Sequence, residues 1–321
     1  MNPQTQSGPV MTVLGPIAAD ELGVTDSHEH LFLRSTAMPG EELDDADRAI
    51  EEVVDGQAGG LSSFVELTPI GLGRRPDLMR EVSTATGASV IAATGYHRDA
   101  HYRAGNWVLD ASDDLLLERM LTDLREGMHP NNWEGADEAL DQARAGVIKC
   151  GASYQHISGN ERRRLEAAAE AARQCGVAVV VHAEVGTVGD EIADVLAGGG
   201  AAADQVVLAH MDRNPDAELH ADLLSRGMFM VYDTPGRIKY QPDSALLTLI
   251  ENVLDAGFGG QILLGLDLGR REYWRAYGGG PGLGYLMERF VPRLQRRIGA
   301  DAVRRLLVDN PARAFALRRP A

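Results

Sequence analysis

Cysteine and long apolar segments are both scarce in this chain of 321 residues. Its two cysteines, Cys150 and Cys175, are too few for a disulfide scaffold or a cysteine-rich zinc module. No apolar run approaches the about 18 residues that span a membrane, and residues 1–9 lack the basic and apolar regions of a secretion signal. The sequence therefore predicts a cytoplasmic protein with no membrane partner.

Positive charge is in short supply as well. The chain has 47 acidic and 31 basic residues, which gives a formal net charge of −16. This balance argues against nucleic acid as a partner, whereas a local pocket could still bind a small anion. No GxGxxG follows an early strand and no GxxxxGK[ST] occurs, so neither common nucleotide-binding motif is present.

Lysine is almost absent. Lys149 and Lys239 are the only two in the chain, and every other cationic side chain is arginine. A GC-rich genome, which favours arginine codons, would account for the general bias. Each remaining lysine is nevertheless a candidate for a role that arginine cannot fill.

Short apolar runs alternate with helix-like stretches along the whole chain. Runs that are apolar almost throughout suit strands covered on both faces, as in a parallel sheet. Eight of them predict an α/β fold, a (β/α)8 TIM barrel, in preference to a doubly wound open sheet. The predicted strands are residues 23–26, 61–68, 89–96, 146–151, 177–185, 205–211, 228–233 and 261–267.

The intervening segments complete the prediction. Residues 160–174, 216–226 and 244–256 are expected to be helices, and residues 302–317 a closing helix. Residues 1–22 are expected to form an N-terminal cap. With no linker or low-complexity block, residues 1–321 are predicted to form a single barrel domain.

The first predicted strand leads into a histidine pair. Side chains alternate along a strand, so His28 and His30 point to one side and Glu29 to the other. Two imidazoles about 6–7 Å apart on one strand can bind a single divalent metal. An isolated HxH is more often a pair of surface or core histidines, so the pattern needs support from the other strands.

Other strand ends supply that support, because function in a barrel lies at the C-terminal ends of the strands. The histidines His182 and His210 end predicted strands five and six, Asp267 ends strand eight, and Lys149 lies in strand four. The remaining histidines are assigned to loops or helices: His97, His101, His129, His156 and His220.

Lys149 requires a specific chemistry. An ammonium group has no lone pair and would repel a metal. A lysine carbamate, formed with carbon dioxide, is an anionic ligand that can bridge two cations. The alternatives are a Schiff-base lysine of a lyase and a lysine that only extends to the barrel rim.

The sequence resembles the phosphotriesterase family of the amidohydrolase superfamily. The resemblance is carried by residues 13–17 (VLGPI), 21–23 (ELG), 28–31 (HEHL) and 309–315 (DNPARAF), and by the order of the lysine, histidines and aspartate at the strand ends. It implies a metal-dependent hydrolase with a binuclear centre, and a homodimer is the family expectation. His28, His30 and Asp267 would bind one ion and His182 and His210 the other, with carbamylated Lys149 and a hydroxide between them.

In such a centre the metal ions and Asp267 would have separate roles. Metal binding lowers the pKa of water towards about 7, and one ion polarises the scissile oxygen. Asp267 is placed to accept the proton as the catalytic residue. Zinc is the first choice for imidazole and carboxylate ligands, and manganese and cobalt are alternatives.

The loops after predicted strands seven and eight are rich in cationic side chains. They carry Arg237, Lys239, Arg270, Arg271 and Arg275. Such a cluster suits a phosphate or carboxylate on a small-molecule substrate, although solvated loop charge is the simpler explanation.

These loops resemble the family branch that opens phosphorylated sugar lactones. The resemblance assigns the phosphate to Lys239, Arg270 and Tyr273, with Arg271 also within reach. Tyr96 and His97 follow the third predicted strand and are candidates to face the substrate, although Tyr96 could equally pack in the core. The alternative substrates are an uncharged lactone, a carboxylester or a phosphotriester.

Overall fold

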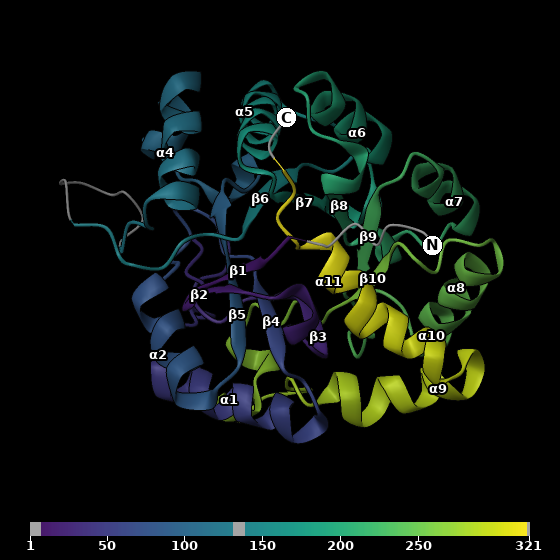
Figure 1. Ribbon diagram of the computed structural model, residues 1–321. Coiled ribbons are helices and arrows are strands. Elements are labelled where there is room, and N and C mark those ends of the chain that lie inside the picture. The colour runs from purple at the N-terminus through teal and green to yellow at the C-terminus, as the bar shows by residue number, and fades with distance from the viewer. Residues whose placement is uncertain (1–7, 131–138, 320–321) are drawn as a thin grey trace.

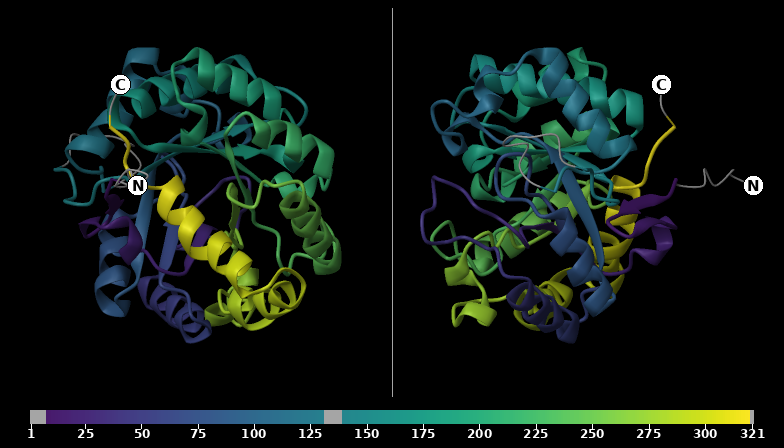
Figure 2. Two further views of the ribbon diagram at one scale, coloured as in Figure 1. Left: turned by 45° about the vertical axis from the view of Figure 1, so that its right-hand side comes forward. Right: turned by 90° about the vertical axis from the view of Figure 1, so that its left-hand side faces the viewer.

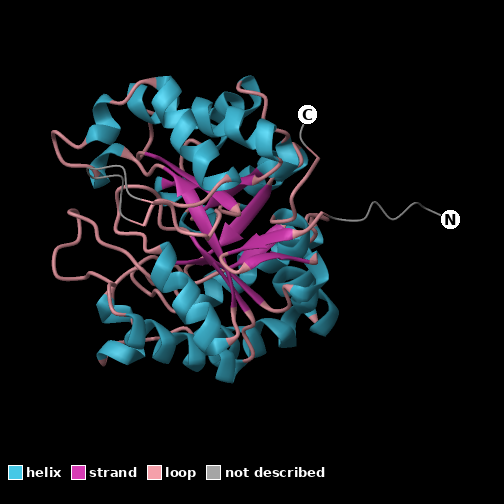
Figure 3. Ribbon diagram, turned by 60° about the vertical axis from the view of Figure 1, so that its left-hand side comes forward, coloured by secondary structure: helices cyan, strands magenta, loops and turns pink. Residues whose placement is uncertain are grey.

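Eight parallel strands form a barrel inside a layer of helices (Figures 1 and 3). The computed structural model describes residues 8–130 and 139–319. The barrel strands are β3 (Thr25–Glu29), β4 (Ser63–Glu66), β5 (Ser89–Gly95), β6 (Val147–Ala152), β7 (Ala178–Ala183), β8 (Val206–Ala209), β9 (Phe229–Tyr232) and β10 (Ile262–Leu264). Neighbours pair in sequence order from β3 to β10.

The last strand meets the first. The backbone N–H of Asp267, just beyond β10, donates to the carbonyl of His28 in β3 at 2.9 Å. A doubly wound sheet would break the sequential strand order, so the predicted (β/α)8 TIM barrel is confirmed.

Helices cover the outside of the barrel. They are α1 (Ala46–Gly59), α2 (Pro76–Thr86), α3 (Trp107–Asp110), α4 (Asp113–Arg125), α5 (Gly159–Cys175), α6 (Gly189–Gly198), α7 (Ala217–Ser225), α8 (Asp243–Asp255), α9 (Val291–Ile298), α10 (Ala300–Arg304) and α11 (Asn310–Ala314). Among the described residues, no helix combines the length and the apolar character needed to cross a bilayer.

An apolar plug closes the N-terminal end of the barrel. Val10, Leu22 and Phe315 are buried in one cluster with inward-facing strand residues such as Val180 and Leu263. The predicted cap is an antiparallel hairpin of β1 (Val10–Thr12) and β2 (Gly15–Ile17), and it lies with α11 at this end of the barrel (Figure 2). Residues 1–7 of the predicted cap lie outside the described residues.

The observed element boundaries differ from the predicted ones by up to three residues, and two of these differences have a clear structural cause. The first strand begins and ends later than residues 23–26, because β3 continues through polar residues that are all buried, from Asp26 to Glu29. The closing helix is interrupted, since a π-helical turn over residues 305–309 separates α10 from α11. Neither difference changes the topology.

Gly95 ends β5 in a conformation that excludes a side chain. Its φ is +100°, and a Cβ atom would lie 2.3 Å from the carbonyl oxygen of Lys149. Gly87, at the end of α2, also has a positive φ, of +74°, but it has nothing within 4 Å of a Cβ atom.

These two glycines allow a matched test. Gly87→Ala should lower the free energy of unfolding by about 1–2 kcal/mol, the cost of the left-handed conformation alone. Gly95→Ala should cost more than about 3 kcal/mol, because the backbone of Lys149 must also move. Urea unfolding measures both, and equal losses would contradict a close contact at Gly95.

Candidate metal centre

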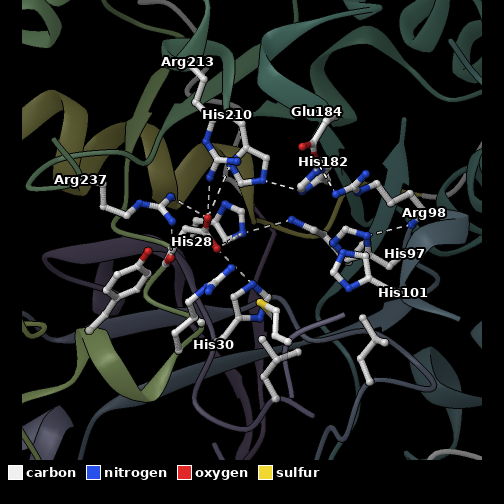
Figure 4. Close-up of a pocket in the computed structure, with 18 of the residues that line it drawn as sticks. His28, His30, His97, Arg98, His101, His182, Glu184, His210, Arg213 and Arg237 are labelled. Atoms are coloured by element: carbon white, nitrogen blue, oxygen red, sulfur yellow. Dashed lines mark hydrogen bonds and ion pairs between the residues drawn. The ribbon is translucent and has the colours of Figure 1, made fainter. Parts of the chain in front are cut away.

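The C-terminal ends of the strands surround a cavity of about 210 Å³ (Figure 4). All six residues predicted to bind metal line it: His28, His30, Lys149, His182, His210 and Asp267. They come from five strand ends that are far apart in sequence. The barrel therefore brings the predicted set together.

His28 and His30 each turn one ring nitrogen towards Asp267. Their Nε2 atoms lie 3.7 Å and 3.3 Å from Asp267 Oδ1. On the opposite ring edges, His28 Nδ1 is 2.7 Å from Asp233 and His30 Nδ1 is 2.8 Å from Thr68 Oγ1. These acceptors place the ring protons on Nδ1, so both Nε2 lone pairs can bind a metal. The ligand atoms of His28, His30 and Asp267 lie within 4.8 Å of one another, close enough to share one cation.

His182 and His210 form a second pair of nitrogen donors. His210 Nδ1 lies 2.8 Å from Asp233 Oδ1, and His182 Nε2 lies 2.5 Å from Glu184 Oε2. Each carboxylate accepts a ring proton, which leaves His210 Nε2 and His182 Nδ1 as the available donors. These two atoms are 2.7 Å apart and in hydrogen-bond contact, and an ion shared by both would replace that contact.

Asp233 contacts His28 from β3 and His210 from the end of β8, and it orients these two histidines instead of offering a ligand atom of its own. It lies close enough to His28 and His210 to complete a possible metal-binding group. Both of its oxygens, however, already accept hydrogen bonds from the Nδ1 atoms of these histidines. Burial would raise the pKa of the Asp233 carboxyl, but the two imidazoles hold it well below its usual range.

Lys149 is fully buried, with its Nζ 3.2 Å from His28 Nε2. Burial lowers the pKa of the Lys149 amine to about 8, although the nearby carboxylates of Asp267 and Asp233 oppose this shift. A lower pKa increases the fraction of the amine that is uncharged at neutral pH. Only the uncharged amine has the lone pair that reaction with carbon dioxide requires.

Asp267 is held between two guanidinium groups. Its Oδ2 accepts from Arg213 and from Arg237, each at 2.7 Å, and its carbonyl accepts from Arg237 at 2.9 Å. Burial would raise the pKa of the Asp267 carboxyl, but Arg237 and the neighbouring histidines keep it well below its usual range. The side chain is therefore ionised and available as a ligand or proton acceptor.

The predicted phosphate-binding residues divide into two groups. Lys239, Arg270 and Tyr273 line the cavity, and Lys239 Nζ donates to Tyr273 Oη at 2.5 Å. Arg271 points elsewhere: its Nε donates to the carbonyl of Glu42 at 2.7 Å, and it does not line the cavity.

Tyr96 is placed in the core instead of the cavity. It is fully buried, its hydroxyl donates to the carbonyl of Leu116 at 3.1 Å, and its ring packs edge-on against Trp107. The prediction that Tyr96 faces the substrate is therefore wrong, and the core-packing alternative holds. Tyr96 lies in the packing layer between barrel and helices. The next residue, His97, does line the cavity.

Several site residues were given no role from sequence: Arg98, His101, Glu184, Arg213 and Asp233. All lie within six residues of the C-terminal end of a strand. Arg213 follows His210 by one short helical turn, Met211–Arg213, and Asp233 directly follows β9. Asp233 could have been predicted, because it is a polar residue at the C-terminal end of a strand. Arg213 could not, because the short turn that directs its side chain has no periodic pattern in the sequence.

Comparison with known proteins identifies the family. The model of the phosphotriesterase family matches residues 8–315. A phospho-furanose lactonase of Mycoplasmopsis synoviae is 32% identical over 320 residues, which cover 95% of this chain and 91% of that protein. An amidohydrolase structure from Mycoplasma synoviae superposes with a TM-score of 0.93 at 31% identity, over 98% of this chain and 94% of the other.

A further similar structure contains a bound phosphate. The phosphotriesterase homology protein of Escherichia coli, in complex with phosphate in its active site, has a TM-score of 0.83 at 28% identity, over 92% of this chain and 99% of that chain. The family match includes all eight barrel strands, the N-terminal hairpin and α11. This chain is a hydrolase that belongs to the phosphotriesterase family.

Proposed function

We propose that the protein hydrolyses a phosphorylated furanose lactone at a binuclear metal centre. The observation that carries this proposal is a group of cationic side chains beside the histidine-lined floor of one cavity: Arg213, Arg237, Lys239 and Arg270. In a chain of net charge −16, such a group opposes the overall sign and suits an anionic substrate. The name of the Mycoplasmopsis relative supports this substrate class, and the phosphate in the active site of the Escherichia coli structure supports an anionic ligand.

The donor set fits two divalent cations. His28, His30 and Asp267 would hold one, His182 and His210 the other, and a carbamate on Lys149 would lie between them. Imidazole and carboxylate donors favour zinc, with manganese or cobalt as alternatives. Cations bound there would polarise the scissile carbonyl and make water a stronger nucleophile at neutral pH.

The chain's own residues then have separate tasks. Asp267, ionised at neutral pH, accepts the proton of the attacking water and returns it to the leaving oxygen of the opened ring. Lys239, Arg270 and the hydroxyl of Tyr273 bind the phosphate. The cavity volume of about 210 Å³ is below the roughly 300–1,000 Å³ of sites for drug-sized ligands, which favours a small substrate.

The phosphate assignment can be tested with paired substrates. Lys239→Ala and Arg270→Ala should each lower kcat/KM for a phosphorylated furanose lactone by about 10- to 100-fold, the loss of one charged hydrogen bond. Neither should change kcat/KM for the unphosphorylated lactone. Steady-state kinetics on both compounds gives the comparison.

Arg271→Ala is the matched control, because it removes the neighbouring charge from a side chain outside the cavity. Free sugar phosphates should inhibit the wild-type enzyme competitively. Equal activity on both lactones, or an Arg271→Ala effect as large as that of Arg270→Ala, would refute the assignment.

The carbamate can be tested because the chain has only two lysines. Metal-free protein loaded with zinc and 13C-labelled bicarbonate should give a carbamate signal in its 13C NMR spectrum. That signal should survive Lys239→Ala and disappear in Lys149→Ala, together with most of the bound metal. About two metals per chain with no signal that depends on Lys149 would rule out the carbamate.

The role of Asp233 is tested by Asp233→Asn. An amide offers one oxygen and one NH₂ group, so one of the two imidazoles must turn an acceptor nitrogen towards it and lose its Nε2 lone pair. Metal affinity should fall by about 10- to 100-fold, as measured by competition with a chelator. Asp123→Asn is the control, since Asp123 is an equally buried carboxylate that binds Arg74; unchanged affinity in Asp233→Asn would disprove the orienting role.

A further inference from the structure

The wall of the cavity opposite Arg213 and Arg237 has a different chemistry. His97, Arg98, His101 and Glu184 form it, and Figure 4 shows them on the far side of His28 from the two arginines. The ring centroids of His97 and His101 are 4.0 Å apart, and that of His97 lies 4.7 Å from His182. The proposed hydrolysis assigns no role to His97.

His97 is fixed at three points. Its backbone N–H donates to Tyr102 Oη at 2.9 Å, and its carbonyl accepts from Arg164 at 3.0 Å. Its ring Nδ1 accepts the backbone N–H of Arg98 at 2.8 Å. A side chain held in this way is pre-organised, and little conformational entropy is lost when it binds a ligand.

These contacts also define the ring proton. Because Nδ1 of His97 accepts a hydrogen bond, the neutral imidazole carries its proton on Nε2. The ring therefore presents an N–H donor on the edge opposite to its backbone contact. Since His97 lines the cavity, this donor is available to a ligand bound beside His182.

Gly151 in β6 makes the position of His97 possible. A Cβ atom on Gly151 would lie 2.8 Å from the backbone nitrogen of Arg98 and 3.1 Å from His97 Nδ1. Any larger residue would push the turn away from the strand. The absence of a side chain at this point on β6 thus lets the histidine approach the centre.

We propose that His97 Nε2 donates a hydrogen bond to the substrate hydroxyl on the carbon next to the lactone carbonyl, and so selects hydroxylated sugar lactones. This inference rests on the proposed function. In a furanose lactone the phosphate-bearing carbon is attached beside the ring oxygen, and the carbon next to the carbonyl lies across the ring. With the phosphate at Lys239 and Arg270 and the carbonyl at the centre, that hydroxyl faces the wall that carries His97.

The test compares a phosphorylated furanose lactone with its analogue that lacks this hydroxyl. Wild-type enzyme should prefer the hydroxylated compound by about tenfold in kcat/KM, as one hydrogen bond provides. His97→Phe should abolish the preference by lowering kcat/KM for the hydroxylated compound alone. His97→Gln should retain part of the preference, because the glutamine amide can place an N–H near the position of Nε2.

Binding gives a readout that does not depend on turnover. The ring-opened acid phosphate and its analogue without the hydroxyl should differ about tenfold in dissociation constant for the wild type and be equal for His97→Phe. His156→Phe is the matched control, since His156 is an exposed histidine outside the cavity. Metal content and thermal unfolding verify that each variant is loaded and folded.

The outcomes separate the two proposals. If His97→Phe retains the wild-type preference, or lowers kcat/KM for both compounds equally, this role of His97 is wrong while the phosphorylated substrate stands. If the wild type neither hydrolyses the phosphorylated compounds nor binds their products, the proposed function fails and the inference fails with it.

Discussion

A single buried carboxylate organises the candidate centre. Asp233 is fully buried at the end of β9 and accepts hydrogen bonds from His28 in β3 and from His210 beyond β8. An ionised carboxylate in this position would be costly without partners, and the two imidazoles provide them. In return Asp233 fixes both tautomers, so that both Nε2 atoms present lone pairs to the same space. Loss of this one group would disturb donors of both proposed metal sites.

Charge in the cavity is balanced locally rather than by the protein as a whole. Asp267 is neutralised by Arg213 and Arg237, although the net charge is −16. The same two guanidinium groups lie at the edge of the cationic wall formed with Lys239 and Arg270. Electrostatic stabilisation of Asp267 and the proposed attraction of an anionic substrate thus depend on one set of side chains.

The sequence predicted the barrel and the candidate ligands that line its cavity because both follow from periodic features. Apolar runs located all eight strands, and the strand-end rule located His182 and His210. The rule failed where the backbone leaves the strand alternation. Gly95 has a φ of +100°, so the side to which Tyr96 points could not be inferred by counting from β5.

The loop after β10 also contains side-chain directions that the sequence could not predict. Arg270 lines the cavity, whereas its neighbour Arg271 contacts Glu42. The two side chains diverge because Arg271 is the first residue of a short helical turn and Arg270 precedes it. A cluster of like charges in sequence indicates that a loop is cationic. It does not indicate which member faces the substrate, since that depends on turn geometry with no periodic signature.

Strain and stability are separated along the barrel axis. His210 and Asp267 have left-handed backbones, with φ of 65° and 52°, and so does the β-branched residue Val185 in the loop after β7. Each such residue costs about 1–2 kcal/mol and persists only where surrounding structure holds it. At the opposite end, Val10 and Phe315 pack into the apolar interior and stabilise the closed end of the barrel. This division allows the C-terminal ends of the strands to hold ligands in conformations that an isolated loop would not maintain.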